Sequence, residues 1–221
     1  MHLLKDIFTY AYRGSGKYVL AVCIGLSVIA SLAQLAPFLG GFASLLLGSY
    51  FCAIFFQLIQ STAVGGKEAP EFPETSNLLE DIILPMLQVF AVAFVSFGPA
   101  LLYVMLAPAS GMKETIYLCL LGAGVIYFPM AMLAVTVLGY LGALSPHIVL
   151  PAIFRAGWLY GVAVLLLVLI YMTEVFLGKL LEGHLILGPL VMAVVTSYTL
   201  MTNARTLGVI YRERQEELNW L

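Results

Sequence analysis

The stretch from Tyr18 to Ala36, YVLAVCIGLSVIASLAQLA, is 19 residues long and contains no charged side chain. At a rise of about 1.5 Å per residue, a helix of this length extends about 28 Å, which matches the hydrocarbon thickness of a bilayer. The stretch therefore predicts a membrane-spanning helix. Ser31-Leu32-Ala33 resembles a signal-peptidase site, which makes a cleaved signal peptide the alternative. Because the apolar run is longer than a usual signal sequence and a second run follows at once, we expect an uncleaved anchor.

The composition of the whole chain also indicates a membrane protein. Of 221 residues, 62% are hydrophobic, whereas about half is usual for a soluble domain. The 10 Lys+Arg and 12 Asp+Glu residues are gathered in short stretches between long uncharged runs. These charged stretches mark the loops. A net charge of −2, without a basic run that contains aromatic residues, excludes nucleic acid as the expected partner.

The apolar runs predict one polytopic transmembrane domain over residues 1–221, an all-α bundle of about six membrane-spanning helices. The expected spans are residues 18–36, 38–60, 85–107, 116–144, 156–178 and 185–203. Pro99 and Pro129 fall inside the third and fourth spans and predict a kink in each. Arg205 to Leu221 is expected to form a charged tail beyond the last span.

Three shorter segments are expected to lie along the membrane interface. Leu3 to Tyr10 mixes apolar and charged residues as an interfacial helix does. In Asn77 to Leu84, Asn77 suits a helix N-cap, and Glu80 stands at the third position after it. Residues 145–155 begin with serine and proline, which suit the first positions of a helix.

Lys and Arg are distributed unevenly among the expected loops. Eight of the ten stand before the first span, after the last span or in the even-numbered loops. The odd-numbered loops hold Lys113 and Lys179. Because cytoplasmic loops of membrane proteins are enriched in Lys and Arg, both termini are expected in the cytoplasm.

One face of the second span carries small residues at every fourth position. They are Gly40, Ser44, Gly48 and Cys52. Small side chains let another helix approach closely in a membrane, so we expect this face to pack against a helix. The neighbouring helix can belong to the same chain or to a second copy.

No catalytic, cofactor or metal site is expected. Motifs of metalloproteases, serine hydrolases and phosphate-binding loops are missing from the sequence. The three histidines and three cysteines do not have metal-ligand spacing. The protein is therefore expected to be non-enzymatic.

Glu174 is the ionisable residue that lies clearly within an expected span. A charge at the bilayer centre costs roughly 2.5–3.5 kcal/mol, so such residues are functional candidates. Glu174 also stands about four residues from the end of its helix, where a side chain can reach interfacial water. We consider it a candidate ion or proton site.

Candidate docking residues occur in the acidic loop from Ser61 to Asp81 and at the C-terminus. They are Glu71, Glu74, Arg212, Arg214 and Trp220. Anionic lipid repels an acidic loop, so its expected contact is a basic surface of a partner or the chain's own Arg155 and Arg212. The C-terminal residues suit either a docking tail or a solvated extension anchored by Trp220.

Several short motifs together resemble a bacterial family of polytopic membrane proteins known as domain of unknown function 4013. The motifs are Gly48-Ser49-Tyr50-Phe51, Gly66-Lys67-Glu68-Ala69-Pro70-Glu71-Phe72-Pro73, Asp81, Phe128-Pro129-Met130-Ala131 and Pro151-Ala152-Ile153-Phe154-Arg155 with Tyr160. The resemblance covers about residues 35–201. It implies a six-helix bundle in a bacterial cytoplasmic (inner) membrane and brings no activity with it.

Two functions are compatible with these features. The first is an accessory or scaffold subunit that lies in the lipid bilayer and assembles with other membrane-protein subunits or with itself. The second is a small transporter or channel in which the proline-containing third and fourth spans frame a pathway and Glu174 titrates.

Overall fold

The computed structural model describes residues 2–34, 37–70, 72, 77, 79–106, 113–184 and 187–220. Within these ranges the chain forms helices and no strand. In chain order the elements are α1 (His2–Thr9), η1 (Tyr10–Tyr12), α2 (Gly16–Ala33), α3 (Pro37–Ala63), η2 (Leu79–Ile83), α4 (Leu84–Leu106), α5 (Lys113–Leu138), η3 (Leu141–Leu144), α6 (Pro146–Leu180) and α7 (Leu187–Leu218). Six helices of the described chain have the length and composition to cross a membrane. The predictions of an all-α fold and of six such helices are confirmed.

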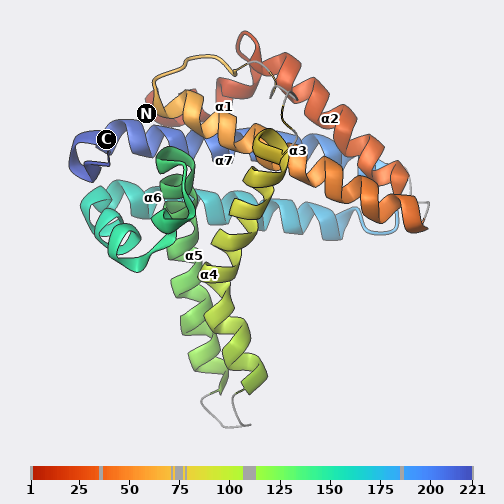
Figure 1. Ribbon diagram of the computed structural model, residues 1–221. Coiled ribbons are helices and arrows are strands. Elements are labelled where there is room, and N and C mark those ends of the chain that lie inside the picture. The colour runs from red at the N-terminus through yellow and green to blue at the C-terminus, as the bar shows by residue number, and fades with distance from the viewer. Residues whose placement is uncertain are drawn as a thin grey trace.

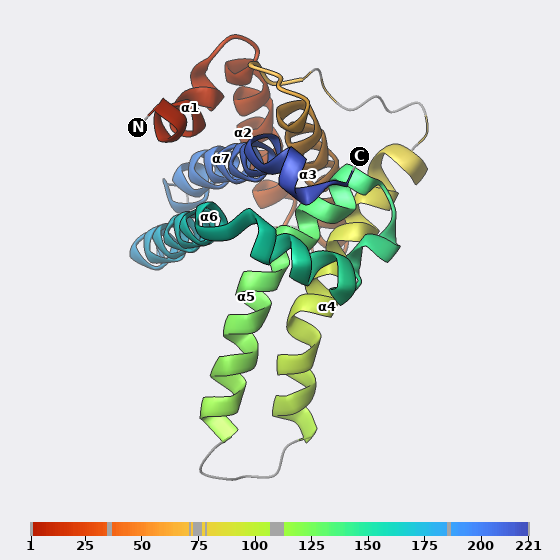
Figure 2. The same ribbon diagram turned by 90° about the vertical axis from the view of Figure 1, so that its left-hand side faces the viewer.

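The long helices do not all run in one direction. Helices α2, α3, α6 and α7 lie side by side, with both termini toward the same end of this group (Figure 1). Helices α4 and α5 pair with each other and run across the other four in both views (Figures 1 and 2). The last turns of α5, from Pro129 to Thr136, are fully buried. The hairpin is thus anchored in the core at one end and projects at the other.

Two predicted boundaries differ clearly from the structure. The fourth span was expected to reach Leu144, but α5 ends at Leu138, where Gly139 adopts φ +77° and the chain turns into η3. The expected interfacial segment and fifth span form one helix, α6, which is broken at Gly157 (φ +62°, ψ −146°). A positive φ of this kind is accessible mainly to glycine, so the sequence fixes where the chain bends.

The prediction of a charged tail starting at Arg205 was wrong. Helix α7 continues to Leu218, and residues Arg205 to Tyr211 are buried. After Arg205 the chain is uncharged as far as Tyr211, so these residues can pack against other helices. The charge at Arg205 is accommodated because polar groups of α1 and α3 surround it.

The start of α4 is a wide π-helical turn, η2, rather than a separate interfacial helix. Its cap is made by Asp81 and not by the expected Glu80. The Asn77 N–H donates to Asp81 Oδ2 (3.0 Å), and the Asp81 N–H donates to the Asn77 carbonyl (2.8 Å). The reciprocal contact therefore forms four residues after Asn77 instead of three.

Pro99 and Pro129 lie inside helices that continue on both sides of them. Beside Pro129, the Tyr160 hydroxyl of α6 accepts from the Met130 N–H (3.1 Å) and donates to the Ile126 carbonyl (2.5 Å). An unbroken α-helix joins these two backbone groups directly. Tyr160 thus bridges the hydrogen-bond ladder of α5 where proline disturbs it.

Candidate functional site

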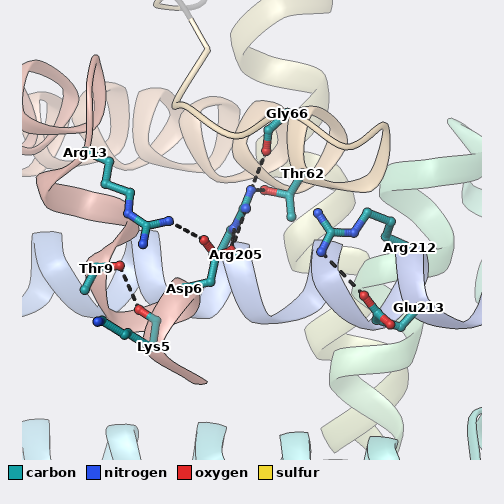
Figure 3. A network of polar contacts seen from close by, with 9 residues as sticks. All are labelled: Lys5, Asp6, Thr9, Arg13, Thr62, Gly66, Arg205, Arg212 and Glu213. Carbon is teal, nitrogen blue, oxygen red and sulfur yellow. Dashed lines mark hydrogen bonds and ion pairs between the residues drawn. The ribbon is translucent and has the colours of Figure 1, made fainter. Parts of the chain in front are cut away.

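The main polar cluster of the described chain surrounds Arg205 of α7, which is only 2% exposed. Its guanidinium lies between α1 and the end of α3 (Figure 3). The Nη2 and Nε atoms donate to Asp6 Oδ2 at 2.7 and 3.3 Å. The Nη1 atom donates to the Gly66 carbonyl (2.5 Å) and to Thr62 Oγ1 (3.3 Å). The Tyr10 ring lies over the same group, 4.5 Å from Cζ.

Asp6 is shared by two cations. Arg13 Nη1 donates to Asp6 Oδ1 at 2.6 Å, on the side away from Arg205. Burial by itself raises the pKa of the Asp6 carboxyl, but the hydrogen bonds and charges of Arg205 and Arg13 outweigh it and hold the pKa below its ordinary value. Asp6 is therefore an ionised partner that binds α1 to α7.

A cavity of about 510 Å³ opens beside this cluster. It is lined by Asp6, Arg13, Lys67, Glu68, Arg205 and Arg212. The most buried cation, Arg205, already has partners on α1 and α3, so the cluster's evident role is to hold these elements together. Sequence reasoning missed the cluster because it placed Arg205 outside the last span; the apolar run that follows Arg205 is the signal that could have found it.

Glu174 of α6 lies against α7. Thr196 Oγ1 donates to Glu174 Oε1 (2.6 Å), and Thr199 Oγ1 donates to Glu174 Oε2 (3.1 Å). A cavity of about 460 Å³ near the α6–α7 connection is lined by Gly178, one turn beyond Glu174, and by Met192, one turn before Thr196. The carboxylate therefore links two helices, one turn away from residues that line this cavity, and does not line the cavity itself.

The four small residues of α3 do not form one continuous contact within the chain. Gly40 is buried, and a Cβ at this position would stand 2.6 Å from the Ala33 carbonyl oxygen of α2. A Cβ at Gly48 would meet nothing within 4 Å, while Ser44 and Cys52 are half-buried. Helices α3 and α7 instead approach closely at Gly208, where a Cβ would stand 2.4 Å from Thr62 Cβ.

The candidate docking residues near the C-terminus contact residues that are close to them in the sequence. Arg212 pairs with Glu213 at 3.5 Å, and Arg214 pairs with Glu217 at 2.5 Å. The Trp220 ring stacks on Tyr211 of α7, with centroids 5.9 Å apart. Arg155, an expected partner of the acidic loop, donates to the Leu218 carbonyl (3.4 Å). The other two candidate residues, Glu71 and Glu74, lie outside the described residues.

Among the residues that the structure describes, no group of three or more His, Cys, Asp or Glu side chains is placed to hold a metal ion. No family model, curated protein or solved structure matches the chain. The resemblance to domain of unknown function 4013 therefore stays a prediction from the sequence motifs.

Proposed function

We propose that the protein is a non-enzymatic subunit of a membrane assembly in a bacterial inner membrane, where it acts as an accessory or scaffold component. Its partners are the surrounding lipid and other membrane-protein subunits or a second copy of this chain. The observation that carries the proposal is the uncovered face of α6. In an 18-residue apolar stretch of this helix, only 6% of the residues are buried in the chain.

The uncovered face extends over five turns of α6. Its residues are Trp158, Val162, Leu165, Leu169, Met172 and Phe176, with exposures from 46% at Val162 to 74% at Trp158. They alternate at intervals of four and three residues, the spacing by which paired helices interlock their side chains. Next to them Gly161 has no atom within 4 Å of a Cβ position, so a partner backbone can approach there. The face thus has the shape and spacing of a helix–helix contact.

Disulfide cross-linking from this face tests the proposal. Cys52, which is partly exposed, and Cys119, which is exposed, would first be replaced by alanine. Single cysteines would then be introduced at Leu165 and Leu169. A cysteine at Phe94, an exposed residue of α4, is the matched control. In native membranes we expect discrete cross-linked species from α6 and none from Phe94. Monomer alone from both α6 positions would contradict the assembly role.

A second candidate is a small transporter or channel. It is supported by the position of Glu174 between two threonine hydroxyls, one helical turn before Gly178, which lines the 460 Å³ cavity. In this function the carboxylate exchanges a proton or a cation with the cavity. Proteoliposomes would be assayed for proton and monovalent-cation flux with the wild type and Glu174→Gln. Flux in the wild type that Glu174→Gln abolishes would favour transport. If neither the wild type nor the variant shows flux, the assembly role is the better account.

A further inference from the structure

Basic side chains from three separate segments line the 510 Å³ cavity beside Arg205. Arg13 stands before α2, Lys67 stands after α3, and Arg205 and Arg212 belong to α7. Because residues seven positions apart fall on the same face of a helix, Arg205 and Arg212 reach the cavity from one side of α7. Figure 3 shows Arg13 and Arg212 on opposite sides of Arg205. Folding thus gathers cations that are far apart in the sequence.

Two carboxylates also line this cavity, those of Asp6 and Glu68. Asp6 is already bound by Arg205 at 2.7 Å and by Arg13 at 2.6 Å. Glu68 makes no ion pair within the part of the chain that the structure describes. Four cations and two carboxylates give the lining a net charge of +2. A lining with this charge attracts an anion into the cavity.

Lys67 and Arg212 are the cations of the lining that are free to meet an anion. Lys67 is exposed, and its ammonium group has no ion pair or hydrogen bond among the described residues. The side chain of Arg212 is 33% exposed, and its ion pair there is the 3.5 Å contact with Glu213. An exposed contact of this length contributes little. Both side chains therefore keep their charge available, whereas Arg205 holds α1 and α3.

The cavity stands at the level where the surface of a bilayer is expected. Helix α7 begins at Leu187, so Arg205 lies about 27 Å along it at a rise of about 1.5 Å per residue. This length is close to the hydrocarbon thickness of a bilayer. Tyr12 and Tyr18, on either side of Arg13, are 65% and 64% exposed. Because exposed tyrosines are enriched at the membrane–water interface, they indicate the same level.

We propose that this cavity binds the headgroup phosphate of an anionic phospholipid. The phosphate lies among Arg13, Lys67 and Arg212, and the acyl chains extend into the surrounding bilayer. Guanidinium groups suit this ligand because their paired N–H donors match two phosphate oxygens. A cavity of about 510 Å³ is within the size range of small-molecule sites. Lipid is favoured over free phosphate because the cavity lies at headgroup level. Binding of this lipid is independent of the proposed assembly role.

Native mass spectrometry of the full-length protein in an uncharged detergent tests the proposal. Dioleoylphosphatidylglycerol is the probe, and dioleoylphosphatidylcholine is the control, because its choline group cancels the phosphate charge. We expect phosphatidylglycerol to bind with an apparent Kd about fivefold lower or better. An equal concentration of inorganic phosphate should not displace it. Equal affinity for the two lipids would overturn the proposal, and so would displacement by inorganic phosphate, which would make free phosphate the ligand.

Charge variants assign the binding to this cavity. Lys67→Gln should weaken phosphatidylglycerol binding about fivefold, because it removes one cation at the membrane surface. Glu68→Gln should strengthen binding, because it removes a carboxylate that repels the phosphate. Both variants should keep the wild-type unfolding temperature, since neither side chain has an ion pair in the described chain.

Lys17→Gln is the matched control for these variants. It removes an exposed lysine in the first turn of α2 that does not line the cavity, so its affinity for phosphatidylglycerol should equal that of the wild type. Unchanged affinity in both Lys67→Gln and Glu68→Gln would overturn the proposal. A loss in Lys17→Gln as large as that in Lys67→Gln would also overturn it, because the lipid would then respond to surface charge in general.

Discussion

Arg205 Nη2 lies 2.7 Å from Asp6 Oδ2, so the last helix is joined to the first across 199 positions of sequence. A guanidinium that is withdrawn from water must keep hydrogen-bond partners on several of its nitrogens. Here they come from α1, the end of α3 and the Gly66 carbonyl. The pair thus fixes where three separate segments meet.

Replacement of Arg205 by methionine should lower the free energy of unfolding by about 3 kcal/mol, because one partner of a buried ion pair is lost. Arg212→Met is the matched control, since its side chain is a third exposed and, among the described residues, its ion pair is a 3.5 Å contact with Glu213. The control should change stability by about 0.5 kcal/mol or less. Thermal unfolding in one detergent measures both variants. Equal losses would show that Arg205 has no special structural role.

The ionised Asp6 predicts a dependence of stability on pH. The folded pKa lies below the unfolded one, so the stabilisation is complete above the unfolded value of about 3.9 and is lost as pH falls through the folded pKa. Asp6→Asn lacks this contribution at every pH. The difference in unfolding temperature between the wild type and Asp6→Asn should therefore shrink on acidification from pH 6 to pH 3. A constant difference would contradict the role of the ionised carboxylate.

The six helices could be predicted because uncharged runs of spanning length leave few other structures available in lipid. The neighbours of each helix could not be predicted, because nearly every face of these helices is apolar. Hydropathy therefore did not indicate that α7 packs on α3, or that the α4–α5 hairpin crosses the other helices (Figures 1 and 2). Such contacts depend on side-chain shape over distant parts of the sequence.

The candidate sites show the same limit. Glu174 was found because an acidic residue in an apolar run is conspicuous, but its threonine partners come from another helix. Regular spacing drew attention to Gly48, whereas Gly208, the glycine in close contact, has no such pattern around it. Arg205 was missed because a charge after a span was taken as the end of the helix.

The two glycines give a matched pair of substitutions. Gly208→Ala should destabilise the protein by about 1–3 kcal/mol, because its methyl group would stand 2.8 Å from the Ile59 carbonyl oxygen and still closer to Thr62. Gly48→Ala meets no atom within 4 Å and should be neutral or stabilising by up to about 1 kcal/mol, since alanine favours a helix. Unfolding temperatures of both variants check this order. The opposite order would show that α3 and α7 do not approach as described.

Because the Tyr160 hydroxyl bridges two backbone groups of α5, we expect Tyr160→Phe to lower the stability of the protein. The variant keeps the ring but leaves the Met130 N–H and the Ile126 carbonyl without the hydroxyl, which should lower stability by about 1 kcal/mol. Tyr171→Phe, at an exposed position of the same helix, is the control and should be neutral. Amide exchange of Met130 should also accelerate in Tyr160→Phe alone. Identical stability and exchange in the two variants would contradict the bridge.

Exposed apolar side chains occur on the projecting hairpin as well as on the other helices, including Phe94, Leu101 and Met105 of α4. Because water disfavours such a surface, we expect lipid to cover α4 and α5 too.

Reporter fusions can test whether this hairpin crosses the bilayer with the other helices. With six spans and both termini in the cytoplasm, fusions after Lys113 and after Lys179 should be active outside the cytoplasm, and a fusion after residue 221 should be active inside. A cytoplasmic signal at Lys113 with an external one at Lys179 would show that α4 and α5 enter the membrane without crossing it, in keeping with their direction across the other helices (Figure 2). A cytoplasmic signal at Lys179 would contradict the six-span topology itself, because α6 and α7 would then not cross as a pair.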